Sequence, residues 1–128
     1  MEKTRILIVE DELIVAEDLS GGLEKEGYDV VAKVSNADQA LEKCLEIRPD
    51  LVLIDVKLEP DNKGLEAARF IRAELGIPVV YLTDYPKQAL PFQKDFRRPS
   101  PCVTKPFREE ELYAIIKAIL KKNERNAE

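Results

Sequence analysis

The chain has 128 residues, a formal net charge of −5 and 45% hydrophobic residues, which predicts one globular domain with its own core. No basic patch dominates, so direct binding to nucleic acid is not expected. The apolar runs are far too short to span a membrane, and the first residues lack the apolar region of a signal peptide. We therefore expect a cytoplasmic domain that makes no contact with a membrane.

The cysteine and histidine content excludes several kinds of metal site and catalytic site. Cys44 and Cys102 have no metal-ligand spacing, and we expect both to be core residues that form no disulfide. The chain contains no histidine, which excludes a histidine-ligated metal, a Ser-His-Asp triad and a histidine general base. It also follows that any phosphohistidine donor has to be another protein or another domain.

Short apolar runs alternate with segments of helical period along the chain. We expect strands at about 5–10, 29–34, 50–55, 78–83 and 102–105. We expect helices at about 12–26, from Ser35 or Asn36 to before Pro49, at about 65–75 and at about 108–122. The segment 84–100 contains several prolines, among them Pro91, and predicts only a short or distorted helix. Residues 1–122 then form the domain, and residues 123–128 form a polar tail that frays.

Each helical segment has an apolar face that predicts its contacts with the core. Gly27 and Gly76 are expected to end the first and third helices. The residues expected to be buried are Leu13, Ala16, Leu19 and Leu23 in the first helix, Ala37, Ala40, Leu41, Cys44 and Leu45 in the second, and Leu112, Ile115, Ile116, Ile119 and Leu120 in the last.

Strands that alternate with helices predict parallel strand–helix units and a doubly wound α/β sheet. The runs at 5–10 and 50–55 are apolar almost throughout, as expected for strands that are covered on both faces. In a five-stranded sheet of order 2-1-3-4-5 these two strands are neighbours at the topological switch point. Ligands bind there, outside the carboxyl ends of the strands.

Five polar side chains follow the predicted strands at that edge. Glu10 and Asp11 end the first run, Asp55 the third and Thr83 the fourth, and Lys105 follows the fifth. Three carboxylates at one point repel one another unless a cation is present, and an all-oxygen site suits Mg²⁺. Asp55 is then a nucleophile for an activated phosphoryl group, with Lys105 and Thr83 contacting the phosphoryl oxygens.

In this pattern the chain resembles a response-regulator receiver domain of two-component signal transduction over essentially its full length. The elements that match are Glu10-Asp11, Asp55, Thr83 and Lys105-Pro106-Phe107. The resemblance implies a flavodoxin-like fold of five strand–helix units, with Asp55 as the phosphoacceptor.

The resemblance also implies the ligands and partners of the site. Mg²⁺ would be held by Asp11, Asp55 and the main-chain carbonyl of Lys57, with Glu10 acting through water, and the bond before Pro106 would be cis. The phosphoryl donor would be a sensor histidine kinase or a phosphotransfer protein, and the downstream effector is not implied. The chain would not be an enzyme in the usual sense, since it would catalyse only its own phosphoryl transfer and dephosphorylation.

Three residues depart from the pattern of the family. In the family, phosphorylation draws the threonine inward and an aromatic residue of the last strand follows it, but that switch position is Cys102 here. Asp84 stands where a small residue is usual, and Pro91 lies in the segment that usually forms a helix. The departures affect the surface of segment 84–100, the last strand and the last helix, through which the family implies a homodimer.

Three other functions are consistent with parts of the pattern. A degenerate receiver would act as a phosphorylation-independent interaction module, which the departures favour and the intact Asp55, Thr83 and Lys105 disfavour. A Mg²⁺-dependent phosphohydrolase would need a second acid two residues after Asp55, where the chain has Lys57. A flavodoxin-like cofactor binder would need a loop that cradles phosphate after the first strand, where acids repel it instead.

Overall fold

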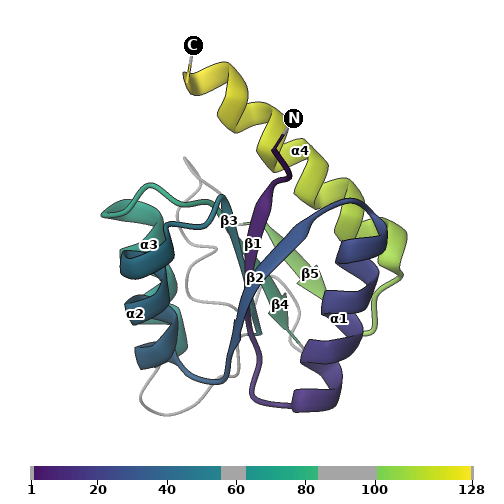
Figure 1. Ribbon diagram of the computed structural model, residues 1–128, viewed down its shortest axis with the longest axis horizontal. Coiled ribbons are helices and arrows are strands. Elements are labelled where there is room, and N and C mark those ends of the chain that lie inside the picture. Colours follow the sequence, from purple (N-terminus) through teal and green to yellow (C-terminus); the bar gives the residue numbers. More distant parts are fainter. Residues whose placement is uncertain (1, 56–62, 84–100, 128) are drawn as a thin grey trace.

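The computed structural model describes residues 2–55, 63–83 and 101–127, with side chains described as far as residue 122. Five parallel strands form one sheet in the order β2-β1-β3-β4-β5, which confirms the predicted doubly wound, flavodoxin-like fold (Figure 1). The strands are β1 (Arg5–Val9), β2 (Asp29–Val34), β3 (Leu51–Asp55), β4 (Val79–Thr83) and β5 (Cys102–Thr104). The helices are α1 (Leu13–Lys25), α2 (Ala37–Ile47), α3 (Lys63–Ala73) and α4 (Glu109–Ala127).

The sheet lies between two layers of helices, with α2 and α3 on one face and α1 and α4 on the other (Figure 1). Because side chains alternate along a strand, each face of the sheet has its own apolar cluster. Leu7, Val52 and Tyr81 belong to the cluster under α2 and α3, whereas Ile8 and Leu53 belong to the cluster under α1 and α4. The central strands are therefore buried on both faces, as their continuous apolar runs predict.

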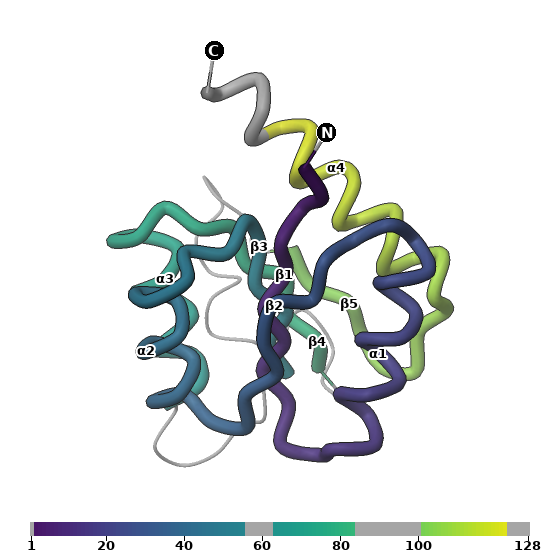
Figure 2. Tube along the Cα trace, in the orientation of Figure 1, coloured from purple at the N-terminus to yellow at the C-terminus, as the bar shows by residue number. Residues whose placement is uncertain are grey.

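Strand register brings the carboxyl ends of the strands to one edge. Val9 pairs with Ile54, so Glu10 and Asp55 follow paired residues of neighbouring strands. Asp55 in turn pairs with Leu82, the residue before Thr83. The N-terminus lies at the opposite edge of the sheet, and α4 runs toward that same edge (Figure 2).

Local signals in the sequence account for several helix ends. The Asn36 side chain accepts a hydrogen bond of 2.9 Å from the backbone N–H of Gln39 and so caps α2. Gly27 and Gly76 have φ values of +96° and +69°, a left-handed conformation that glycine adopts without strain. The predicted ends of α1 and α3 are correct to within a few residues.

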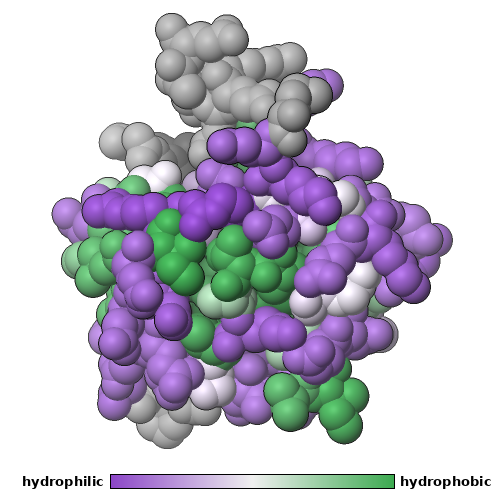
Figure 3. Space-filling view, in the orientation of Figure 1, coloured by the Kyte–Doolittle hydropathy of each residue, from purple (hydrophilic) through white to green (hydrophobic). Residues whose placement is uncertain are grey.

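Two of the residues that were predicted to be buried in the core are exposed instead. Leu13 is 73% exposed because it lies in the first turn of α1, at the end of the helix that reaches past the sheet (Figure 1). Leu45 is 54% exposed because it lies about 100° around α2 from the buried Cys44. Ile14, the next residue, is also exposed, and apolar surface is visible over the start of α1 at the lower right of Figure 3.

The last helix is longer than predicted. It continues to Ala127 rather than ending near 122, since no glycine or proline interrupts residues 108–128. The short or distorted helix expected within 84–100 lies outside the described residues.

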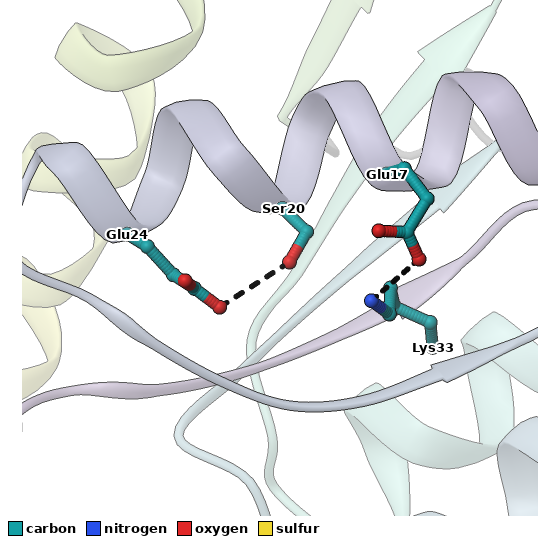
Figure 4. A network of polar contacts seen from close by, with 4 residues as sticks. All are labelled: Glu17, Ser20, Glu24 and Lys33. Carbon is teal, nitrogen blue, oxygen red and sulfur yellow. Dashed lines mark hydrogen bonds and ion pairs between the residues drawn. The ribbon is translucent and has the colours of Figure 1, made fainter.

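Polar contacts tie the elements together away from the carboxyl edge. At the amino edge, the Arg5 guanidinium donates hydrogen bonds to the carbonyls of Ile47 and Arg48 at the end of α2, and the Arg5 N–H donates to Asp50. Lys33 of β2 lies 2.7 Å from Glu17 of α1 (Figure 4), an exposed ion pair that contributes little stability.

Candidate functional site

Three carboxylates meet where β1 and β3 end. Glu10, Asp11 and Asp55 each place one oxygen within 4.8 Å of the others. Their exposure differs, since Glu10 is 5% exposed and the Asp55 side chain is 4% exposed, whereas Asp11 faces solvent. The site therefore has a buried side at Glu10 and Asp55 and an open side at Asp11.

Glu10 is the acid of this group whose charged form is disfavoured by its surroundings. Burial and the neighbouring Asp55 carboxylate raise the pKa of Glu10 from 4.5 to about 8, although Lys105 and the Glu12 N–H oppose the shift. That N–H donates a hydrogen bond of 3.4 Å to Glu10 Oε1, while Oε2 is buried with no hydrogen-bond partner. Such an oxygen is suited to receive a ligand, because an unpaired buried oxygen is costly.

Lys105 compensates part of the negative charge. Its Nζ lies 3.1 Å from Asp55 Oδ2, as an ion pair without the geometry of a hydrogen bond. The Lys105 side chain is 24% exposed, so the ammonium is within reach of solvent. The backbone also holds Lys105 in place, since its N–H donates a 2.7 Å hydrogen bond to the Thr83 carbonyl. The Lys105–Pro106 bond is cis.

The remaining predicted residues lie along β4 and β5. Thr83 is 0% exposed at the end of β4 and pairs with Thr104 of β5. Cys102 is 2% exposed and pairs with Tyr81, so it is a residue of the core. Lys57 and Asp84 lie outside the described residues.

Among the cavities lined by the described residues, two reach Asp55 from different directions. One, of about 230 Å³, extends from the three acids to Asp38 near the start of α2 and to Lys63 at the start of α3. The other, of about 700 Å³, passes Lys105 and runs between α1 and α4. Asp38 and Lys63 are neighbours of the site that were not predicted from the sequence, because only the packing of the helices on the sheet brings them there.

The second cavity has a different lining from the first. Apolar side chains of α1, β4 and α4 form its walls, among them Val15, Leu82 and Leu112, and Glu12 and Glu109 supply negative charge. Asp55 therefore lies between a smaller and a larger cavity, each lined by both apolar and charged side chains.

The donor set at this edge is chemically suited to a hard cation. Carboxylate oxygens with room for water are the ligands that Mg²⁺ prefers, and a divalent ion would offset the charge of the three acids. An oxygen of Asp55 is also positioned beside a lysine ammonium, which is the arrangement that a phosphoryl group requires.

Comparison with known proteins agrees with this geometry. The family model for the response regulator receiver domain matches residues 6–117. The chain belongs to this family. The receiver domain was predicted from the acids at the strand ends and from Lys105-Pro106-Phe107, and that prediction is confirmed.

Relatives of this receiver domain differ in the functions that their names record. The "DNA-binding response regulator MtrA" of Mycolicibacterium smegmatis is 38% identical over 125 residues, which cover 95% of this chain and 53% of that protein. The crystal structure of the response regulator PhyR from Brucella abortus is similar with a TM-score of 0.82 and 32% identity, covering 98% of this chain and 51% of that one.

A third relative is a receiver domain by itself. The signal receiver domain of a modulated diguanylate cyclase from Desulfovibrio desulfuricans has a TM-score of 0.83 at 28% identity, with 98% of this chain and 99% of that chain covered. By contrast, this receiver domain spans about half the length of the MtrA proteins that it matches. Within residues 2–55, 63–83 and 101–127, no helix combines the length and apolarity needed to cross a bilayer.

Proposed function

We propose that this receiver domain accepts a phosphoryl group on Asp55 from a partner histidine kinase or phosphotransfer protein, in the presence of Mg²⁺. The observation that carries the proposal is that two buried acids, each with an oxygen that lacks a hydrogen-bond partner, lie beside a lysine. Glu10 Oε2 has no hydrogen-bond partner, and Asp55 Oδ2 has Lys105 Nζ at 3.1 Å.

The residues that would hold Mg²⁺ are Asp11 and Asp55 directly, the main-chain carbonyl of Lys57, and Glu10 through water. The spacing of the acids supports this assignment, since their oxygens lie within 4.8 Å of one another. When bound, the ion would neutralise the carboxylates and polarise an oxygen of the phosphoryl group.

The chain's own residues would divide the transfer reaction among them. An Asp55 carboxylate oxygen attacks phosphorus and forms the new O–P bond, while the N–P bond to the donor histidine breaks. The electron pair returns to the imidazole nitrogen, which takes up a proton. Lys105 would stabilise the negative charge on one phosphoryl oxygen, and the Thr83 hydroxyl would donate to another.

We also propose where this domain acts and which kind of partner donates its phosphoryl group. Because the chain has no histidine, the donor acts from another protein or domain. Apart from its own phosphorylation and dephosphorylation, we assign no turnover to the domain. A cytoplasmic location is supported by two buried cysteines that form no disulfide, which are usual in reducing compartments. The relatives include both DNA-binding and anti-anti-sigma proteins, so we assign no effector.

Intact-protein mass spectrometry tests the proposal. The chain is incubated with acetyl phosphate and Mg²⁺ and compared with a sample that contains EDTA. We expect a gain of one phosphoryl group with Mg²⁺ alone, and we expect Asp55→Ala to show no gain. Asp50→Ala is a matched control at the opposite edge, where Asp50 accepts from the Arg5 N–H.

Two results would contradict the proposal. Labelling of Asp55→Ala would place the phosphoryl group elsewhere. If the wild type were not labelled and did not bind Mg²⁺ with beryllofluoride either, the phosphorylation-independent interaction module would become the better explanation.

A further inference from the structure

Each of the two cavities described above has one lysine among the described residues that line it. Lys105 lines the larger cavity, and Lys63, the first residue of α3, lines the smaller cavity of about 230 Å³. Lys105 is in contact with the acids, since its Nζ lies 3.1 Å from Asp55 Oδ2. Lys63 lies on the side of α2 and α3, where the proposed transfer reaction uses no cation of the protein.

The smaller cavity is predominantly acidic. Lys63 is the one cationic residue among the described residues of its wall, which also carries four acids, Glu10, Asp11, Asp38 and Asp55. If it is nearly spherical, a cavity of this volume is roughly 8 Å across, which is no more than the distance over which physiological salt screens a charge. A charge on one wall therefore acts on an ion bound at the other wall without touching it.

The position of Lys63 is unfavourable for the helix that contains it. A cation in the first turn of a helix opposes the helix dipole, and Lys63 is the one lysine or arginine in the first turn of any described helix. The first turns of α2 and α4 contain acids without a cation, as the dipole favours. These observations favour a role for the Lys63 charge at the cavity rather than in the stability of α3.

We propose that Lys63 is a specificity-determining residue of this site, which lowers the affinity of the acids for Mg²⁺ and raises the affinity for the anionic phosphoryl group. A positive charge beside the cavity repels the metal ion and attracts the anion. The identity of the anion rests on the proposed function, whereas the effect on Mg²⁺ does not. The two effects have opposite signs, and this distinguishes an electrostatic role of Lys63 from a structural one.

Titration with Mg²⁺ alone, followed by amide chemical shifts, measures the first effect. We expect Lys63→Gln to bind Mg²⁺ about fivefold more tightly than the wild type, from Coulomb's law for a divalent ion roughly 8 Å away in a water-like dielectric. The difference should shrink at high ionic strength. Lys63→Arg keeps the charge and should bind as the wild type does. Asp38→Asn removes the opposite charge from the same cavity and should bind Mg²⁺ more weakly.

Titration with beryllofluoride at saturating Mg²⁺ measures the second effect. We expect Lys63→Gln to bind this anion about twofold more weakly than the wild type, because a single charge is attracted less than a divalent one is repelled. Lys43→Gln is the matched control, since Lys43 is a lysine of α2 that pairs with Glu46 and does not line the cavity. Urea unfolding checks the fold, and Lys63→Gln should be at least as stable as the wild type.

The outcomes separate this role from the proposed function. An unchanged Mg²⁺ affinity in Lys63→Gln, or a change of both affinities in the same direction, would overturn the electrostatic role. If the wild type bound Mg²⁺ but no beryllofluoride, the proposed function would fail, and the Mg²⁺ titration would still decide whether the Lys63 charge acts on the metal ion. A wild type that bound no Mg²⁺ would overturn both.

Discussion

Replacing Glu10 with glutamine should flatten the pH dependence of stability of the metal-free domain. The pKa of Glu10 is raised from 4.5 to about 8 in the folded state, mainly by burial and then by Asp55. Between these values the folded domain retains a proton that the unfolded chain has lost. The free energy of unfolding therefore falls as pH rises, by about 1.4 kcal/mol per pH unit for one proton.

This stabilisation is fully present below pH 4.5 and is lost as pH rises toward 8. Over the whole window the loss is on the order of a few kcal/mol, which is a large part of the stability of a small domain. Glu10→Gln cannot ionise, so the variant should show no such loss. The two proteins should differ little near pH 5 and most above pH 8, where the glutamine variant is the more stable.

Urea unfolding followed by circular dichroism at several pH values, with EDTA present, measures this difference. Glu12→Gln is the control, because Glu12 is a nearby acid that is exposed. Saturating Mg²⁺ should remove the slope from the wild type, since the ion takes the place of the proton. Parallel pH profiles for the wild type and Glu10→Gln would refute the argument that Glu10 is held neutral by its surroundings.

Other predictions concern the site and the helices. Lys105→Gln should slow labelling by acetyl phosphate about a hundredfold, the typical effect of removing one group that stabilises transition-state charge, and an unchanged rate would exclude Lys105 from that role. Gly21→Ala should raise the free energy of unfolding by about 0.5–1 kcal/mol, because a Cβ there meets open space. The free energy of unfolding of Gly22→Ala should be lower than that of Gly21→Ala by about 1 kcal/mol or more, because the new Cβ would overlap the Tyr113 hydroxyl. Combining Gly22→Ala with Tyr113→Phe should remove that difference. Asn36→Ala should lower the free energy of unfolding, measured in urea, by about 1 kcal/mol, and Asn36→Asp should lower it much less. Equal losses in the two variants would show that the side-chain cap contributes nothing to stability.

The sheet and the convergence of the acids could be predicted because both follow from short-range patterns. Continuous apolar runs indicate buried parallel strands, and polar residues at their carboxyl ends must share an edge once the strand order is known. Asn36, Gly27 and Gly76 likewise mark helix ends through local chemistry, and the structure agrees.

Features that depend on three-dimensional packing could not be predicted. Leu13 has the right helical period for the core, but periodicity does not show where a helix extends past the sheet. The burial of Glu10, and hence its raised pKa, depends on how closely the neighbouring strands surround it. Asp38 and Lys63 reach the site only because α2 and α3 pack beside it.

The hydrogen bonds that Arg5 makes at the amino edge of the sheet affect how this domain can change over evolution. Arg5 joins the start of β1 to the end of α2, and its N–H reaches Asp50 just before β3. These bonds lie at the far end of the sheet from Glu10 and Asp55, so altering the reactive acids leaves them intact. Substitutions that change the chemistry at the carboxyl edge can therefore accumulate without breaking the hydrogen bonds at the amino edge. The domain can then diversify in function while its fold is preserved.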